Sequence, residues 1–452
     1  MARRPVLKNV AILTASGLCE RAVGAAYRVF LARLAGSVAL GLLQYCMPVL
    51  RLSLILCTLG LPQALTRVVA QACARHDEPE ARAALGWSLR TAAVTGGIAA
   101  LLLLLLAPAC RRLFADERVW PLLRWLAPTI FFGCLSWILQ AYFQGRNRMW
   151  AVAVTGLLEQ GGKLAVTLVL LGLIERRTPG AIAAAALAAV ACAEMAGLFF
   201  LLILGARSGG LAREGGGADK RALLVNSLPL MGDGLVFAVA GAVDVAVVPR
   251  RLIAAGLAQD RITALMGQAW GMALPTVFLP MVVIWPLAAA TLPAIASSLA
   301  GGDLRGLRRR VWRTCAAVAA VGAAATGFFL LAARPLMRML YACPEAASHL
   351  RAFSLVACPV YLASISGTLL AGLGRSAALF RQSLACAMLR TFLLYILTGM
   401  PGLGIAGAAV GIAAGNAALA AANLATVHRC LCPEKETAGG RMAASALSRS
   451  GS

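Results

Sequence analysis

Long apolar stretches alternate with short polar connections along almost the whole chain. Several stretches exceed the ~18 residues that separate a membrane-spanning helix from a buried helix of a soluble protein. We therefore expect an all-α polytopic membrane protein with about 12 transmembrane helices, and a polar segment at 66–82 after the second of them. The predicted spans cover residues 9–34, 40–61, 86–107, 122–142, 149–173, 179–204, 223–247, 264–296, 311–333, 350–373, 377–398 and 404–427.

A Gly-rich, charged segment interrupts this pattern near the middle of the chain and has the composition of a flexible connection. We expect an N-terminal six-helix lobe at 1–205, a cytoplasmic linker at 206–221, a C-terminal six-helix lobe at 222–427 and a disordered cytoplasmic tail at 428–452. A shift of 217 positions places Gly24 on Gly241 and Arg33 on Arg250. This echo predicts two pseudo-symmetric lobes related by a parallel repeat, which is typical of transporters that alternate access to a central site.

Basic residues exceed acidic ones strongly, 42 to 18, for a net charge of +24. We expect no nucleic-acid partner, because no zinc-ligand spacing, RNA-binding aromatic motif or soluble basic domain accompanies this charge. With the N-terminus inside, the inner connections hold 23 Lys and Arg and the outer connections 10. This positive-inside distribution predicts that both termini are cytoplasmic.

No catalytic or metal-binding arrangement is visible in the sequence. The 13 cysteines are scattered, and His428, Cys430 and Cys432 lack a fourth ligand for a structural zinc site. The segment from Gly156 to Lys163 resembles a phosphate-binding loop, but Lys163 lies one position too late and no Ser or Thr follows it. We therefore expect no enzyme, no metal and no cofactor.

The first span contains the charges Glu20, Arg21 and Arg28. A charge near the bilayer centre costs roughly 2.5–3.5 kcal/mol on insertion scales, so such residues usually face a protein interior or a watery cavity. Arg21 and Arg28 are seven residues apart, which brings them to within ~20° of each other on one helix face. A cationic stripe of this kind could bind an anion, and Arg51 in the second span could extend it or pair with Glu20.

Further charged residues lie inside other predicted spans. Glu159 and Lys163 have the i, i+4 spacing of an ion pair, with a cavity or coupling role as the alternative. Asp233 and Asp244 share one helix face and could bind a coupling proton or cation, or Asp244 could form a salt bridge near Arg250 and Arg251. Glu194 stands alone in its span and is less interpretable.

The order of several motifs is similar to that of a known family. They are SGLCERAVGAAYRVFLARLAG, GLPQALTRVVAQ, AYFQGRNRM, LLEQGGK, VVPRRLIAAGL, MGQAWGMALPTVFLPMVVIWPLAAATLPAIA and GLGIAGAAVG. The chain resembles the polysaccharide-exporting branch of the multidrug/oligosaccharidyl-lipid/polysaccharide (MATE-like) flippase superfamily, in its stage V sporulation B-type group. The resemblance covers both lobes almost end to end.

The resemblance implies a central V-shaped cavity in a bacterial cytoplasmic membrane. The implied substrate is an undecaprenyl-linked saccharide such as the peptidoglycan precursor lipid II. Arg21 matches an arginine that holds pyrophosphate in related flippases, and Gln144 and Lys163 lie in matching motifs, so all three are candidate substrate contacts. Three features differ from those of relatives. Some relatives have two further lipid-guiding helices that are not expected here. The eighth predicted span, 264–296, has Gln268 and no basic residue, and Lys163 stands where relatives often have Arg.

Three functions follow from these features. The first is a flippase that holds the anionic head group with Arg21, Arg28 and Arg51 and works as a monomer, with an ion or proton as a possible coupling partner. The second is an ion-coupled multidrug exporter, which the excess of arginines over free carboxylates disfavours for cationic drugs. The third is a non-transporting membrane scaffold for cell-wall synthesis.

Overall fold

The structure, a computed structural model, describes residues 3–112, 114–207, 220–282, 284, 291, 295 and 304–431. Within this part of the chain every regular element is a helix and none is a strand. The all-α prediction is therefore confirmed. The predicted linker lies largely outside the described residues, and so does the predicted tail beyond Leu431.

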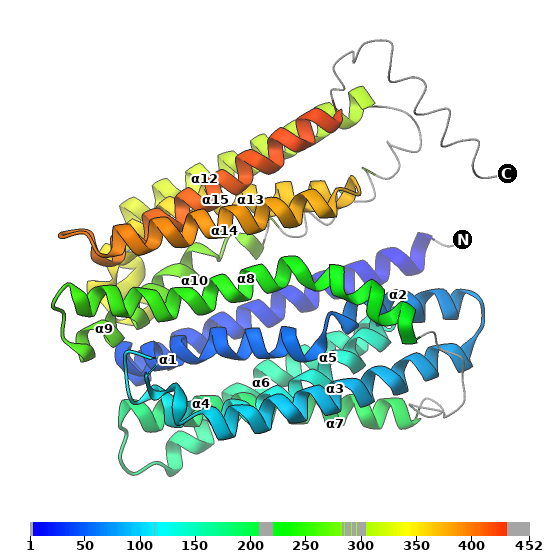
Figure 1. Cartoon of the computed structure of the whole chain (residues 1–452), viewed down its shortest axis with the longest axis horizontal. Coiled ribbons are helices and arrows are strands. Elements are labelled where there is room, and N and C mark those ends of the chain that lie inside the picture. The colour runs from blue at the N-terminus through cyan, green and yellow to red at the C-terminus, as the bar shows by residue number, and fades with distance from the viewer. Residues whose placement is uncertain are drawn as a thin grey trace.

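Helix α1 (Arg3–Thr58) is a hairpin of two arms rather than one straight helix. Gly36 separates the arms with φ 73° and ψ 179°, a conformation that a residue with a Cβ rarely adopts. Figure 1 shows the second arm running back beside the first. The two arms are the first two predicted spans.

Five longer helices and the short α4 complete the N-terminal lobe. They are α2 (Leu61–Ala74), α3 (Glu78–Leu106), α4 (Val119–Leu123), α5 (Leu126–Gly145), α6 (Met149–Leu173) and α7 (Pro179–Arg207), with a 3-10 turn at Ala109–Arg112. The segment expected to be merely polar after the second span forms α2, which buries Leu61, Leu65 and Val69 on one face. Gly60, at φ 70°, turns the chain into this amphipathic helix.

The C-terminal lobe begins with α8 (Lys220–Ala254), and its second span is interrupted. That span was expected as a single helix over 264–296. Its described part consists instead of α9 (Gln259–Met266), the π-helix η2 (Gly267–Ala273) and α10 (Leu274–Val277). The remaining helices are α12 (Leu304–Tyr341), α13 (Ala347–Gly372), α14 (Ser376–Thr398) and α15 (Gly404–Leu431), with a 3-10 turn at Pro344–Ala346.

Nine helical stretches of the described residues are long and apolar enough to cross a membrane. One of them, Gly17–Thr58, contains both arms of α1, and α8 with the interrupted α9–α10 segment accounts for the other predicted spans. The fourth span of each lobe is the most enclosed: 61% of the α5 window and 61% of the α13 window is buried, against 11% for α3 and 11% for α14. The equal burial of the two fourth spans supports the expected pseudo-symmetry.

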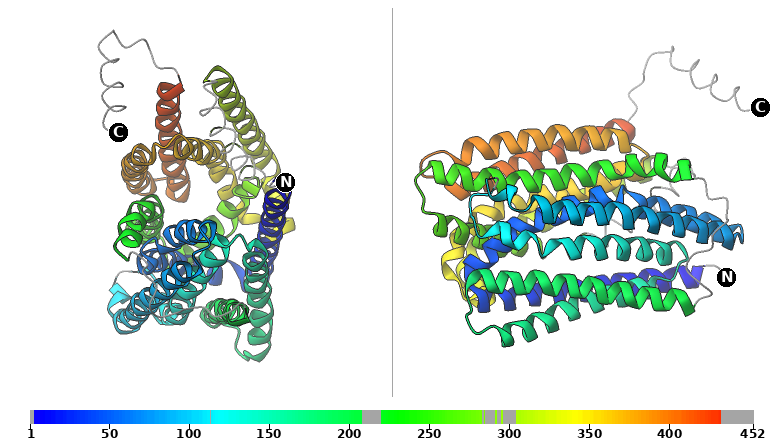
Figure 2. Two further views of the ribbon diagram at one scale, coloured as in Figure 1. Left: turned by 90° about the vertical axis from the view of Figure 1, so that its right-hand side faces the viewer. Right: turned by 60° about the horizontal axis from the view of Figure 1, so that its bottom comes forward.

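The two lobes meet along the second arm of α1. This arm carries many of the contacts that α1 makes with α8, α9 and η2. Figure 1 shows the lobes close together around α4 and α9 and farther apart toward the end where α1 begins and α15 ends. In the left view of Figure 2, nearly along the helix axes, α12–α15 form one group and α3–α7 another.

Candidate functional site

Arg21 and Arg28 of the first α1 arm are both exposed, whereas Tyr27 between them is buried. Gly24 faces α6, where a Cβ in its place would lie 3.3 Å from Gln160 Oε1. The arm therefore packs its small residues on α6. At the matching positions of α8, Ala238 and Val245 are buried.

Arg28 is the centre of a cationic cluster between the lobes. It interacts electrostatically with Arg51 of the second α1 arm, with Lys163 of α6 and with Tyr341 at the end of α12. Arg28 and Arg51 are exposed, and neither forms a salt bridge with a carboxylate of the described residues. The positive charges of Arg28 and Arg51 therefore repel each other, and no carboxylate of the described residues neutralises them through a salt bridge.

Lys163 is held differently from what its i, i+4 spacing predicts. Its Nζ donates to Gln160 Oε1 at 2.6 Å and lies 4.9 Å above the Tyr27 ring, whose hydroxyl is 3.0 Å from Thr167 Oγ1. Glu159 instead accepts hydrogen bonds from Gln140. Glu159 and Lys163 therefore interact electrostatically without forming a salt bridge, because Gln140 and Gln160 supply their hydrogen-bond partners.

Three carboxylates line the inner faces of α1, α6 and α7. Glu159 interacts electrostatically with Glu20 and Glu194, and also accepts from Ser136 at 3.3 Å. Glu194, which looked isolated in the sequence, also interacts with Lys163. Its Oε2 is buried without a hydrogen-bond partner among the described residues. No spacing within α7 signals this role, since the partners come from other helices.

Glycines make room for these carboxylates. A Cβ at Gly156 would collide with Glu20 Oε1, and one at Gly197 would lie 2.9 Å from Glu159 Oε1. Because real Cβ atoms do not approach so closely, both helices need glycine where they face a carboxylate.

The remaining candidate residues lie apart from this cluster. Gln144 is exposed at the last turn of α5. Asp244 forms a salt bridge with Arg390 of α14, not with the Arg250–Arg251 pair, because Arg251 donates to the Tyr395 carbonyl at 3.1 Å. The Asp233 side chain lies outside the described residues.

A polar network joins the lobes at the end where they are close. Asp116, only 2% exposed, accepts from Arg118 at 2.7 Å and from Thr263 of α9 at 2.7 Å. Arg118 also reaches Asp260 of α9 at 2.7 Å. Burial alone would raise the pKa of Asp116, but hydrogen bonds from Arg118 and Thr263 outweigh it and leave the pKa below its ordinary value.

Close backbone contacts reinforce this closed end. A Cβ at Gly41 would overlap the Thr263 carbonyl oxygen, and one at Gly267 would overlap the Ser37 carbonyl oxygen. Arg33 also donates to the Leu340 carbonyl at 2.8 Å and to that of Met339. Together these contacts lock α1 onto α9, η2 and the end of α12.

Among the described residues, no group of three or more His, Cys, Asp and Glu side chains is arranged to hold a metal ion. The sequence cluster around His428 falls partly outside them, since Cys432 is not described. His428 instead lies with its ring 6.1 Å from that of Trp312.

Solved structures of membrane transporters share this fold. A structure titled as the inward-facing conformation of a multidrug resistance MATE family transporter of the MOP superfamily superposes with a TM-score of 0.77 at 16% identity, covering 93% of this chain and 96% of that chain. An outward-facing structure with the same description gives 0.65 at 18% identity, covering 95% and 97%. A MOP superfamily transporter from Pyrococcus furiosus gives 0.68 at 16% identity, covering 95% and 97%. The protein is thus a multi-pass membrane protein with the MATE-type fold.

The sequence comparison defines the family within that fold. The model of the family described as polysaccharide biosynthesis protein matches residues 6–299, and the chain belongs to this family. The chain is also 28% identical over 441 residues to stage V sporulation protein B of Bacillus subtilis (strain 168), covering 95% of this chain and 85% of that protein. By sequence the chain thus belongs to the polysaccharide biosynthesis protein family, and its fold is the one seen in MATE transporters.

Proposed function

We propose that the protein is a flippase that carries a lipid-linked anionic saccharide across a bacterial cytoplasmic membrane by alternating access. The observation that carries the proposal is that the exposed Arg28 and Arg51 lie close enough to interact electrostatically. Two exposed guanidinium groups that repel each other are stabilised when an anion bridges them, and the planar fork of Arg binds phosphate oxygens at two points. A pyrophosphate head group supplies such an anion.

In this proposal the substrate is an undecaprenyl-linked peptidoglycan or polysaccharide precursor such as lipid II. Family membership in polysaccharide biosynthesis supports that class. Arg21 extends the cationic surface along the first arm of α1, and Lys163 approaches it from α6. Gln144 lies at the helix end and would contact substrate only near the membrane surface.

The lobes are arranged as in an inward-facing state. The polar network and the glycine contacts close one end, and the superposition is better with the inward-facing MATE structure than with the outward-facing one. The start of α1 and the end of α15 both lie at the opposite, wider end. This placement is consistent with both termini being cytoplasmic.

The carboxylate cluster is the proposed coupling element. Glu20, Glu159 and Glu194 lie close enough to interact, and closely spaced carboxylates favour uptake of a proton or cation. Lys163 links this cluster to Arg28, so protonation of a carboxylate would change the field at the anion site. Asp244 has a charge-balancing role through Arg390.

The test is flipping of a fluorescent polyprenyl-pyrophosphate saccharide in proteoliposomes. Arg28→Ala removes one charge-assisted contact, worth about 1.5–3 kcal/mol, so transport at low substrate concentration should fall about tenfold or more. Arg28→Lys should retain part of the activity. The control is Arg176→Ala, which removes an exposed arginine from the connection between α6 and α7. Equal flipping by wild type and Arg28→Ala would remove Arg28 from the proposed site.

A multidrug exporter is the second candidate, because the solved relatives with this fold include multidrug resistance transporters and because the carboxylate cluster could bind a coupling cation. Drug-resistance profiles of expressing cells distinguish the two. Resistance to cationic drugs that depends on Glu159, with no flipping of lipid-linked saccharide, would favour the exporter.

A further inference from the structure

The first turns of α12 carry a dense group of arginines that has no part in the cationic cluster described above. Arg305, Arg308, Arg309, Arg310 and Arg313 lie within nine residues and all are exposed. Arg309, Arg310 and Arg313 form no salt bridge with a carboxylate of the described residues. Such a group attracts an anion.

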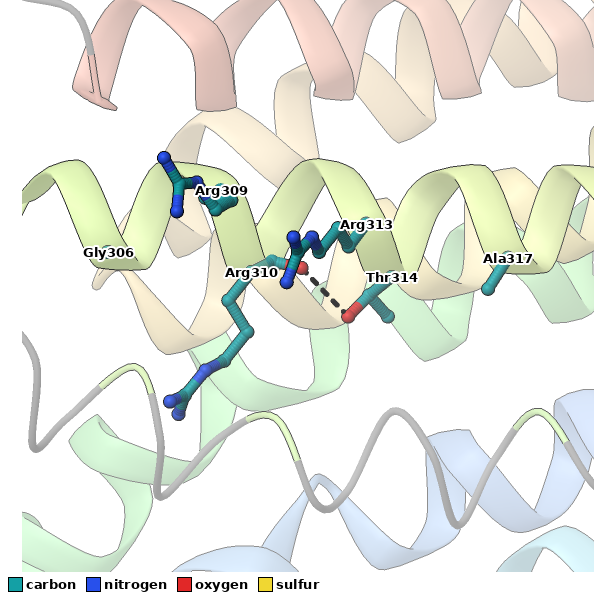
Figure 3. A pocket seen from close by; sticks show the side chains of 6 residues that line it. All are labelled: Gly306, Arg309, Arg310, Arg313, Thr314 and Ala317. Carbon is teal, nitrogen blue, oxygen red and sulfur yellow. Dashed lines mark hydrogen bonds between the residues drawn. The ribbon is translucent and has the colours of Figure 1, made fainter.

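Three of these arginines, Arg309, Arg310 and Arg313, line an open hollow. Its lining residues recur every three or four positions along one helix face, and its volume is about 360 Å³. They are Gly306, Arg309, Arg310, Arg313, Thr314 and Ala317. Figure 3 shows Arg309, Arg310 and Arg313 projecting from this stretch, with Thr314 hydrogen-bonded back to the Arg310 carbonyl at 3.0 Å. The hollow is large enough for a phosphate group.

The same face becomes apolar directly beyond the arginines. Ala317, Val321 and Ala324 continue the three-and-four spacing and are all exposed, Val321 by 42%. The rise of ~1.5 Å per residue places Ala324 ~17 Å from Arg313, close to half of the ~30 Å hydrocarbon thickness. The face thus matches a molecule with an anionic head and one leaflet's length of hydrocarbon.

Trp312 indicates the level of the α12 arginines relative to the membrane surface. It lies among the arginines, is 38% exposed and packs edge-on against His428 near the end of α15. Tryptophan is enriched at the level of lipid head groups, where one part of its ring is apolar and the other wet. The arginines at this level therefore lie where lipid phosphates are.

We propose that this face of α12 binds an anionic phospholipid of the leaflet on the side of the chain termini, with the phosphate held by Arg309, Arg310 and Arg313 and one acyl chain lying along Ala317, Val321 and Ala324. Arginine clusters beside a membrane helix attract anionic lipids because each basic residue near the surface adds to the attraction. The site lies on the helix exterior and does not depend on which substrate the protein carries.

The experiment measures lipid retention by the full-length protein in detergent with native mass spectrometry. Dioctanoyl-phosphatidylglycerol should bind, and dioctanoyl-phosphatidylcholine should bind at least about tenfold more weakly. In Arg310→Gln/Arg313→Gln the phosphatidylglycerol affinity should fall about tenfold or more. The matched control, Arg176→Gln/Arg177→Gln, removes two exposed arginines from the opposite end of the molecule and should bind as wild type does.

Two further arms separate a folding defect from loss of the site and one lipid from another. Arg310→Lys/Arg313→Lys keeps the charge and should restore most of the binding, which a misfolded variant would not. Farnesyl pyrophosphate represents an isoprenoid pyrophosphate and should not displace phosphatidylglycerol. Unchanged phosphatidylglycerol binding in Arg310→Gln/Arg313→Gln would overturn the proposal. The proposal would also be overturned if this variant lost binding of farnesyl pyrophosphate and kept binding of phosphatidylglycerol.

Discussion

Single glycines determine where the carboxylates of the N-terminal lobe can lie. Gly156 and Gly197 each face a carboxylate oxygen on a neighbouring helix at a distance that leaves no room for a Cβ. The acidic side chains therefore occupy space that glycine leaves open rather than space that they create. This arrangement lets three acidic groups come together beside Lys163.

The first prediction concerns Gly156→Ala. The new methyl group must displace the Glu20 carboxylate, and overpacking of this kind typically destabilises by about 1–3 kcal/mol. Thermal unfolding in detergent should show a lower melting temperature. Gly161→Ala on the same helix is the control, because no atom lies within 4 Å of its Cβ position. It should be neutral, and equal melting of the two variants would contradict the packing argument.

The charged residues of the cationic cluster could be singled out from sequence alone, because a charge in an apolar span is costly wherever it lies. The hydrogen-bond and electrostatic partners of these residues could not be predicted from the sequence. The spacing of Glu159 and Lys163 indicates a pair, but Ser136 and Gln140 of α5 take one member and Gln160 the other. Glu194 shows the same limit, since its neighbours come from helices distant in sequence.

At the scale of elements, helix bounds were predictable where a polar residue or a proline ends an apolar run. Both bounds of α6 agree with the expectation, and α7 begins at Pro179 as expected. The π-helix η2 was not predictable, because its sequence, GQAWGMA, contains no proline or charged residue that would signal a change of helix type. Its geometry follows from tertiary packing: Gly267 and Gly271 lie against Ser37 and Leu40 of α1.

The second prediction tests this contact with Gly267→Ala. The added methyl group cannot fit against the Ser37 carbonyl, so the lobes should separate at the closed end. Spin labels at Arg176 and Glu345, exposed in outer-end connections of the two lobes, should report a longer distance in a background lacking the exposed Cys19 and Cys192. Gly327→Ala, with open space around its Cβ position, should leave the distances unchanged. Unchanged distances in Gly267→Ala would show that η2 does not control closure.

For the whole molecule, a wide end and a locked end are what the proposed alternating access requires. The lock combines backbone contacts, which depend little on pH, with the Asp116 network, which depends on charge. Asp260 is 80% exposed at its side chain, so its bond with Arg118 adds little. Asp116 is buried and carries the pH dependence of closure.

The last prediction follows from the lowered pKa of Asp116. A carboxylate whose pKa is lower in the folded state than its ordinary value of 3.8 stabilises the fold above that value. The stabilisation is lost as pH falls through the lower folded pKa, because protonation removes the charge that Arg118 binds. At pH 7, Asp116→Asn should therefore have a lower melting temperature than wild type. Its free energy of unfolding should be smaller by on the order of 1 kcal/mol or more.

That difference between wild type and Asp116→Asn should shrink as the pH falls below 3.8 toward the lower pKa of the folded state, because the unfolded wild type then binds a proton that folding must release. Thermal melts in detergent between pH 7 and pH 3 measure it. Asp260→Asn is the control and should differ little from wild type across the range, since that carboxylate is exposed. A gap for Asp116→Asn that stays constant down to the most acidic melts would mean that hydrogen bonding, and not charge, holds the lobes together at this end.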